Sequence, residues 1–235
     1  YPSTLHPAHY IFIADYENRG FLYVAKKYGD KGWRYKLKRI IKIIKDFYMT
    51  MKIDIKEQYL DKFEDFIAQY PIFEYRILNT GDLSVEERVR IVCQQECERY
   101  GSTWACPPAV GTLKECEERI RKFGQAVFFS SVAEVSDLMN MQEMLQTRAA
   151  HEELTTEVAR FLKEQGFETF TLSTESCDIC EDCAYPHGKP CRHPDRMHPC
   201  LESHGVVVSE IVEKQQMEYN LGGNTILWFS MVLFK

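Results

Sequence analysis

Four cysteines gathered in one short stretch, CDICEDCAYPHGKPC, are the residues of this sequence best suited to chemistry. Cys177, Cys180 and Cys183 are separated by two residues each, and Cys191 follows after a loop with two prolines and a glycine. Two-residue gaps let neighbouring thiolates curl toward one centre, and the loop can turn back to add the fourth. The spacing therefore predicts a metal centre whose main ligands are Cys177, Cys180, Cys183 and Cys191.

The grouping of the thiols indicates which metal they hold. Three closely spaced cysteines are typical of iron–sulfur proteins, where a similar run wraps three corners of a four-iron cluster. Structural zinc sites more often use two pairs of cysteines separated by a longer spacer. We therefore favour an iron–sulfur cluster of the 4Fe-4S type, with zinc as the alternative cofactor and free buried thiols as the least favoured interpretation.

A second group of cysteines lies upstream, in CQQECERYGSTWACPP. Cys93 and Cys97 share one face if this stretch is helical, and the two prolines after Cys106 favour an extended chain there. We expect Cys93, Cys97 and Cys106 to bind metal, either at a second site or by completing a site with a downstream thiol. The alternative is that Cys93 and Cys97 pack as small hydrophobic residues.

Other polar residues near the loop have simpler expected roles. Four histidines are expected to be solvated or hydrogen-bonded, namely His187, His193, His198 and His204. His193 is the best candidate for a further ligand because it stands two residues from Cys191. The guanidinium of Arg192 could stabilise the negative charge of a thiolate centre. The alternative role for Arg192 is an ion pair with Asp195 at the surface. Cys116 falls inside a predicted helix, where we expect it to pack.

Alternating helices and strands must position these residues. Helices are predicted over residues 56–69, 112–123 and 138–166. Thr112 and Glu115 have the spacing of a capping box. Strands are predicted over residues 72–78, 125–132, 167–172 and 225–234. Residues 206–217 are ambiguous between helix and strand. The sequence thus predicts an α/β or α+β fold, with an about four-stranded sheet, helices packed on it and a cysteine-rich metal-binding loop region.

Charge divides the chain into two parts. Residues 1–50 carry ten Lys or Arg against four Asp or Glu, whereas the remainder is acidic enough to give the whole chain a net charge of −6. We expect an N-terminal extension over residues 1–50, lying upstream of the native start, and a cysteine-rich metal-binding domain over 51–235. The acidic domain has no basic stripe, which argues against nucleic acid as a partner.

Composition narrows the class of protein. The 235 residues are 45% hydrophobic and 27% charged, which is ordinary for a soluble globular protein. No apolar run approaches the ~18 residues of a membrane span, and the first residues lack the apolar core of a secretory signal. We therefore expect a cytoplasmic protein with reduced thiols, which favours metal ligation over disulfides. Dinucleotide, phosphate-loop and nucleophile-elbow motifs are absent from the sequence.

The cysteine motifs also resemble those of a known family. In order, ERVRIVC, CPPAVGTL, CAYP, PCRHP and LESHGVVV are similar to the motifs of predicted metal-binding proteins catalogued as domain of unknown function 2284. The resemblance extends from about residue 51 to the C-terminus. It implies metal binding at seven cysteines, which are Cys93, Cys97, Cys106, Cys177, Cys180, Cys183 and Cys191, and it implies no reaction. Cys116 and Cys200 depart from the family pattern, since the resemblance suggests a small residue such as serine at Cys200.

Three classes of function are consistent with these features. The first is an iron–sulfur protein that serves electron transfer or redox sensing for a partner enzyme. The second is a zinc-stabilised interaction module without chemistry of its own, and the third is an enzyme whose open cluster binds a small substrate. The sequence does not decide whether the protein is an enzyme.

Overall fold

The computed structural model describes residues 10–15, 20–25 and 57–235, and the chain forms two compact units. The first unit, Tyr1–Asp65, contains an antiparallel hairpin of β1 (Tyr10–Asp15) and β2 (Gly20–Ala25). The helix α2 (Glu57–Ile67) ends in the second unit, Phe66–Lys235. The domain start that the sequence predicts at Met51 lies outside the described residues, so the division at that residue stays a prediction.

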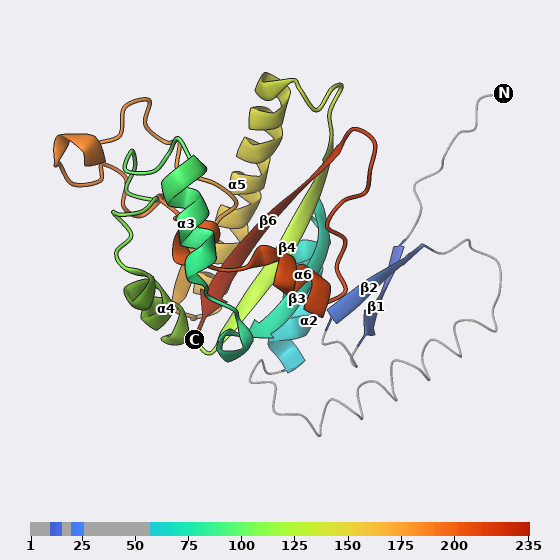
Figure 1. Ribbon diagram of the computed structural model, residues 1–235. Helices are drawn as coiled ribbons and strands as arrows, with labels where there is room; N and C mark the ends of the chain where they lie inside the picture. The colour runs from blue at the N-terminus through green and yellow to red at the C-terminus, as the bar shows by residue number, and fades with distance from the viewer. Residues whose placement is uncertain (1–9, 16–19, 26–56) are drawn as a thin grey trace, which may run out of the picture. The chain divides into compact units, whose positions relative to one another are not determined.

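The second unit is built on four antiparallel strands (Figure 1). These are β3 (Ile72–Asn79), β4 (Gln125–Glu134), β5 (Thr169–Leu172) and β6 (Thr225–Phe234). Each coincides with a strand predicted from the sequence. β6 pairs with β4 on one side and β5 on the other, so the most apolar strand occupies a central place. Because every pairing is antiparallel, the fold is α+β.

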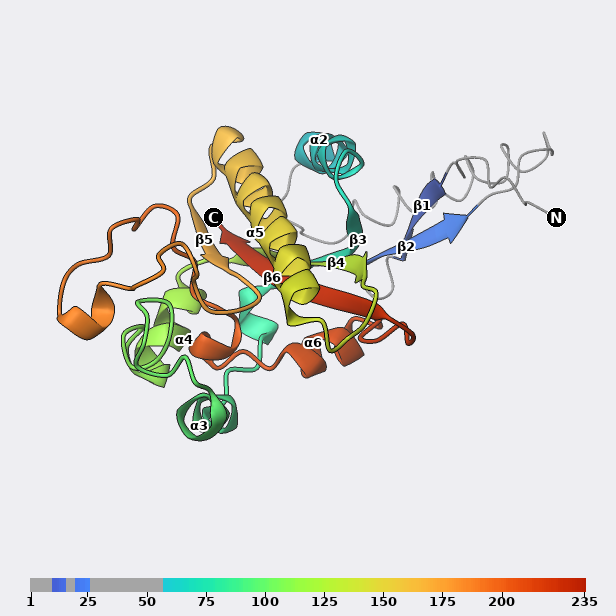
Figure 2. The same cartoon turned by 90° about the horizontal axis from the view of Figure 1, so that it is seen from above.

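Helices cover both faces of this sheet. Apart from α2, the helices are α3 (Glu87–Glu96), α4 (Leu113–Arg121), α5 (Met141–Glu164) and α6 (Val208–Lys214). The ambiguous segment over 206–217 therefore contains a helix. α5 lies on one face, and α4 and α6 lie on the other (Figure 2). The predicted capping box is confirmed, because Thr112 accepts from the Glu115 amide and Glu115 accepts from the Thr112 amide. None of the described helices has the length and apolar character needed to cross a bilayer.

Hydrophobic packing fixes α4 and α6 against the sheet. Phe128 of β4 stacks on Phe229 of β6 with ring centroids 5.5 Å apart. Ile120 of α4 is fully buried in the same core, and Ile211 of α6 packs there too. Burial of side chains of this size stabilises the fold by about 2 kcal/mol each. This packing fixes the helices on the sheet, and with them the loops at their ends.

The interface between α5 and the sheet contains a polar seam, defined by Ser131, His151, Ser230, Ser173 and Glu152. Ser131 Oγ lies 2.7 Å from His151 Nδ1, and Ser230 Oγ lies 2.8 Å from His151 Nε2. Ser173 lies 3.4 Å from Ser230 and donates a hydrogen bond to Glu152. Burial lowers the pKa of His151 to about 3, so its imidazole is neutral at pH 7. The seam thus carries a chain of buried polar groups to the α5 surface.

Candidate metal centre

The downstream cysteines lie on one loop that follows β5 and is closed at its base. The Ser173 amide donates to the Pro199 carbonyl over 2.8 Å, and the Leu201 amide donates to the Ser173 carbonyl over 3.1 Å. Ser173 and Cys200 form an isolated parallel bridge at this point. We name residues 174–199 the cysteine loop. Its base is fixed to the sheet edge, while the rest projects from the second unit (Figure 1).

The four predicted main ligands line one narrow cavity in the cysteine loop. Cys177, Cys180, Cys183 and Cys191 are each half-buried, and the cavity among them has a volume of about 10 Å³. Burial raises the pKa of Cys177, and the nearby thiols of Cys191, Cys183 and Cys180 raise it further. A volume of this size holds about one water molecule. The structure therefore brings together the four thiols that the sequence pairs by spacing.

Backbone amides and an arginine surround these thiols. The His193 amide donates to Cys191 Sγ over 3.4 Å, and an amide hydrogen bond from Ile179 favours the thiolate of Cys177. Arg192 lines the cavity, and its guanidinium donates to the Asp182 carbonyl over 2.7 Å. The alternative pair with Asp195 is not formed. Positive charge and N–H donors near a thiolate centre stabilise its negative charge.

Trp104, which lies between α3 and α4, closes the cavity from outside the loop. Its indole N–H donates to the Lys189 carbonyl over 3.0 Å, and its ring packs edge-on against Tyr185 at 4.9 Å. Sequence reasoning missed this residue as part of the site. The sequence did offer one indication, because Trp104 is an aromatic residue within a cysteine-rich polar segment. Aromatic side chains in such places limit the access of solvent to a metal centre.

The upstream cysteines come from α3 and the segment after it. Cys93 is in α3, and Cys97 is the exposed C-cap residue of that helix, so the two do not pack together as buried hydrophobes. Burial raises the pKa of Cys93 to about 11, and Cys97, Glu202 and Cys106 raise it in that order. Cys93 Sγ lies 3.9 Å from the Glu202 carbonyl oxygen. The three upstream cysteines thus lie near the turn that contains Glu202.

Cys106 is buried and does not lead into the extended chain that its prolines predict. The Val110 amide donates to the Cys106 carbonyl over 3.3 Å, which makes a turn over these residues. The prediction considered only the preference of single residues, and the hydrogen bond across the turn outweighs it. Cys106 Sγ donates to Ser176 Oγ over 3.1 Å, and so contacts the residue before Cys177.

The two remaining cysteines differ in their surroundings. Cys200 is buried near the upstream group, and its Sγ accepts the Ser203 amide hydrogen over 3.2 Å. Burial, then Glu202, and more weakly Cys106, raise its pKa. Cys116 is fully buried in α4, where the Arg90 guanidinium lies 3.5 Å from its Sγ. Cys116 therefore occupies a packing position, whereas Cys200 lies near Cys106 of the upstream group.

The thiols face one another without forming a closed ligand set. Within residues 59–235, no three side chains of Cys, His, Asp or Glu are arranged closely enough to hold a metal ion. Of the histidines, His187 contacts Asp182 at 3.0 Å and His204 contacts Arg119 at 2.7 Å. His193 lines the narrow cavity. Metal binding at either cysteine group would therefore draw the thiols closer together.

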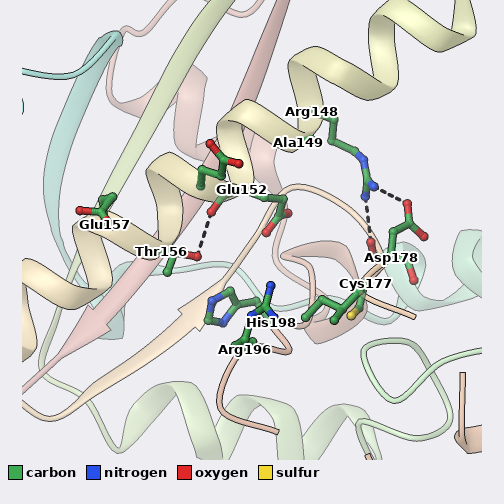
Figure 3. Close-up of a pocket in the computed structure, with 12 residues that line it drawn as sticks. Arg148, Ala149, Glu152, Thr156, Glu157, Cys177, Asp178, Arg196 and His198 are labelled. Carbon is green, nitrogen blue, oxygen red and sulfur yellow. Dashed lines mark hydrogen bonds and ion pairs between the residues drawn. The ribbon is translucent and has the colours of Figure 1, made fainter. Parts of the chain in front are cut away.

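A second and larger cavity lies beside the cysteine loop (Figure 3). Its volume is about 490 Å³, and Cys177 and Ile179 line both cavities. Burial raises the pKa of Glu152, which lies in its wall and ends the polar seam. Sequence reasoning missed this cavity, because its residues come from α5 and from the loop and have no common spacing.

Comparison with known proteins assigns the chain to a family. No curated protein and no solved structure matched the chain. One family matched over residues 76–234, a range that contains all seven cysteines that the resemblance implies as ligands. The chain therefore belongs to the family of predicted metal-binding proteins described as domain of unknown function 2284.

Proposed function

We propose that this protein holds an iron–sulfur cluster on Cys177, Cys180, Cys183 and Cys191, and that it serves electron transfer or redox sensing for a partner enzyme. The observation that carries the proposal is that these four thiols line one cavity. Four cysteine thiolates are the usual ligands of a 4Fe-4S cluster, so the donor set fits. When bound, such a cluster supplies one-electron transfer.

The residues around the thiols support this role. The amides of Ile179 and His193 donate to Cys177 and Cys191, and hydrogen bonds to ligating sulfur favour the more negative, reduced state. The Arg192 guanidinium favours the same state through its charge. Trp104 covers the cavity and restricts water, which protects the thiols from oxidants. These groups would set the reduction potential that a partner enzyme meets.

The upstream cysteines support a second centre. The pKa of Cys93 responds to Cys97 and Cys106, and the pKa of Cys200 responds to Cys106. The contact of Cys93 with the Glu202 carbonyl and that of Cys200 with the Ser203 amide lie in the same turn, which supports a centre formed by thiols from both segments. Cys93, Cys97 and Cys106 would hold this centre, with Cys200 as the nearest fourth thiol.

A zinc-stabilised interaction module is the second candidate function. The volume of about 10 Å³ between the downstream thiols favours it, since a single ion needs less movement of the loop than a four-iron cluster. Zinc bound by four thiolates is a structural site without redox chemistry. In that function the cysteine loop would be a rigid surface for a partner protein.

Anaerobic purification followed by analysis of iron, acid-labile sulfide and zinc tests the proposal. We expect about equal amounts of iron and sulfide and a brown protein with broad visible absorption, because thiolate-bound iron absorbs in that region. Stoichiometric zinc without sulfide would overturn the iron–sulfur proposal in favour of the zinc module. The matched variant Cys116→Ala should keep the metal content of the wild type.

A further inference from the structure

The larger cavity has the size and position of a small-molecule site. Its volume of about 490 Å³ lies within the range of roughly 300–1,000 Å³ that is usual for ligand pockets. α5 forms one wall and residues of the cysteine loop form the other (Figure 3). Because Cys177 belongs to the wall, a molecule in this cavity would lie beside one of the proposed metal ligands.

The two walls of the cavity differ in charge. The α5 wall carries three carboxylates, Glu152, Glu153 and Glu157. Arg196 and His198 lie across from them on the cysteine loop (Figure 3). A ligand with only a negative charge would be repelled by the carboxylates. A ligand with only a positive charge would leave Arg196 without a partner, so the two walls together suit a ligand that carries both charges.

Several of these groups are already paired within the protein. Glu157 accepts from Tyr70 over 3.1 Å and also pairs with Arg160. Asp178 pairs with Arg148 and with Arg99 at one end of the cavity. Arg148 donates to the Ser176 carbonyl over 2.9 Å as well, and only 7% of its surface is exposed. Glu157 and Asp178 are thus held by the protein, whereas the buried Nε of Arg148 has no hydrogen-bond partner among the described residues.

The groups that remain free define the ligand. The side chains of Glu153 and Arg196 make no hydrogen bond or ion pair with any residue that the structure describes. The buried Nε2 of His198 also has no hydrogen-bond partner among the described residues. Glu152 accepts from Ser173 through one carboxylate oxygen, which leaves the other for a ligand. Leaving a buried polar atom without a hydrogen-bond partner is unfavourable, and a complementary ligand would remove that cost.

We propose that this cavity binds a small zwitterion, with its ammonium group against Glu152 and Glu153 and its carboxylate against Arg196 and His198. The polar seam holds Glu152 in place through Ser173, so this acceptor is preorganised for the ammonium group. Binding follows from the cavity alone and does not depend on the proposed function of the cysteine loop.

Three probes of matched length test the assignment by isothermal titration calorimetry on the full chain. They are 6-aminohexanoate, which carries both charges, hexanoate, which carries only the anion, and hexylamine, which carries only the cation. We expect 6-aminohexanoate to bind about tenfold more tightly than either of the others, the ratio expected for one additional partly buried charged hydrogen bond.

Two exposed variants separate the two contacts. Arg196→Gln should weaken 6-aminohexanoate and hexanoate about tenfold and leave hexylamine unchanged, while Glu153→Gln should weaken 6-aminohexanoate and hexylamine and leave hexanoate unchanged. Lys114→Gln and Glu118→Gln are the matched controls, because they make the same charge changes on exposed residues of α4. They should leave all three affinities as in the wild type.

The outcomes separate this inference from the proposed metal centre. Metal content is measured in each sample before titration. Protein that holds metal but binds 6-aminohexanoate no more tightly than hexanoate or hexylamine would overturn the zwitterion site and leave the metal centre intact. Equal losses in the α4 controls would also overturn it. Selective binding by protein that holds no metal would support the zwitterion site and count only against the proposed metal centre.

Discussion

Cys106 Sγ donates a hydrogen bond to Ser176 Oγ over 3.1 Å, and Ser176 directly precedes Cys177. Ser176 is also in contact with Thr103, whose hydroxyl lies 3.2 Å from its own. The Ser176 side chain thus joins the segment of the upstream cysteines to the first cysteine of the downstream group. A change at either group should therefore be felt at the other.

Replacing Cys106 tests this connection. In Cys106→Ala, Ser176 loses one hydrogen-bond partner, so we expect the visible spectrum or reduction potential of the downstream centre to shift while its iron is retained. Visible absorption and a redox titration measure the effect. If the downstream spectrum is unchanged while total metal falls in part, the two groups are separate sites without communication. Unchanged spectrum and full metal would mean that Cys106 only packs.

Replacing any one of the downstream thiols should have a larger effect. We expect Cys177→Ala, Cys180→Ala, Cys183→Ala and Cys191→Ala each to lose the centre or leave it labile, because a missing ligand exposes the metal to solvent. Metal analysis and circular dichroism are read together, since structural thiolate sites can contribute on the order of 10 kcal/mol to folding. A folded variant that keeps a full, stable centre would exclude the replaced cysteine as a ligand.

Removal of the first fifty residues tests the predicted division of the chain. A protein that begins at Met51 should fold and bind metal like the full chain, because the family match lies within residues 76–234 and includes both cysteine groups. The removed part contains the hairpin of β1 and β2. Solubility, circular dichroism and metal content provide the measurement, and loss of any one would show that the fold needs residues 1–50.

His151 should make the protein sensitive to acid. Its pKa is about 3 in the fold and 6.5 for a histidine in an unfolded chain, so below pH 6.5 the unfolded chain binds a proton that the folded chain does not. The free energy of unfolding should therefore fall as pH decreases from 6.5 to 3, with a slope of about 1.4 kcal/mol per pH unit at most from this group. Above pH 6.5 the contribution is constant.

The variant His151→Gln isolates this contribution in urea unfolding measured across that pH range. It should be less stable at pH 7, because it disturbs the hydrogen bonds to Ser131 and Ser230, and its stability should depend less steeply on pH. Effects of pH on metal binding are common to both proteins and cancel in the difference. An identical pH slope in variant and wild type would contradict the assignment.

Local features of the sequence were sufficient to predict most elements of the second unit. The capping box at Thr112 and the apolar run of β6 are encoded in neighbouring residues, so they could be read before the structure. Residues 206–217 were ambiguous because valines favour strands, whereas packing of Ile211 in the core requires the helix. The turn after Cys106 was missed because a hydrogen bond, rather than a single-residue preference, sets it.

The residues of the candidate site also fall into two groups, those that local spacing predicts and those that depend on the packing of distant segments. The downstream thiols share a cavity because their spacing is local, and this much the sequence could predict. Trp104, Ser176 and Glu152 were not predicted, because each reaches the site through the packing of a distant segment. Trp104 depends on the chain between α3 and α4, and Glu152 depends on where α5 crosses the sheet. Such relationships have no signature in a single sequence.

The bridge between Ser173 and Cys200 holds the two ends of the cysteine loop together, so the loop can vary while the sheet stays the same. Both ends of the loop leave the sheet edge at one place, so its length and ligand spacing can change at an entropic cost of only about 0.6 kcal/mol for each doubling of length. Evolution could therefore change the number and spacing of the cysteines in this loop without rebuilding the antiparallel core. A protein engineer could do the same, and graft metal-binding loops onto this base.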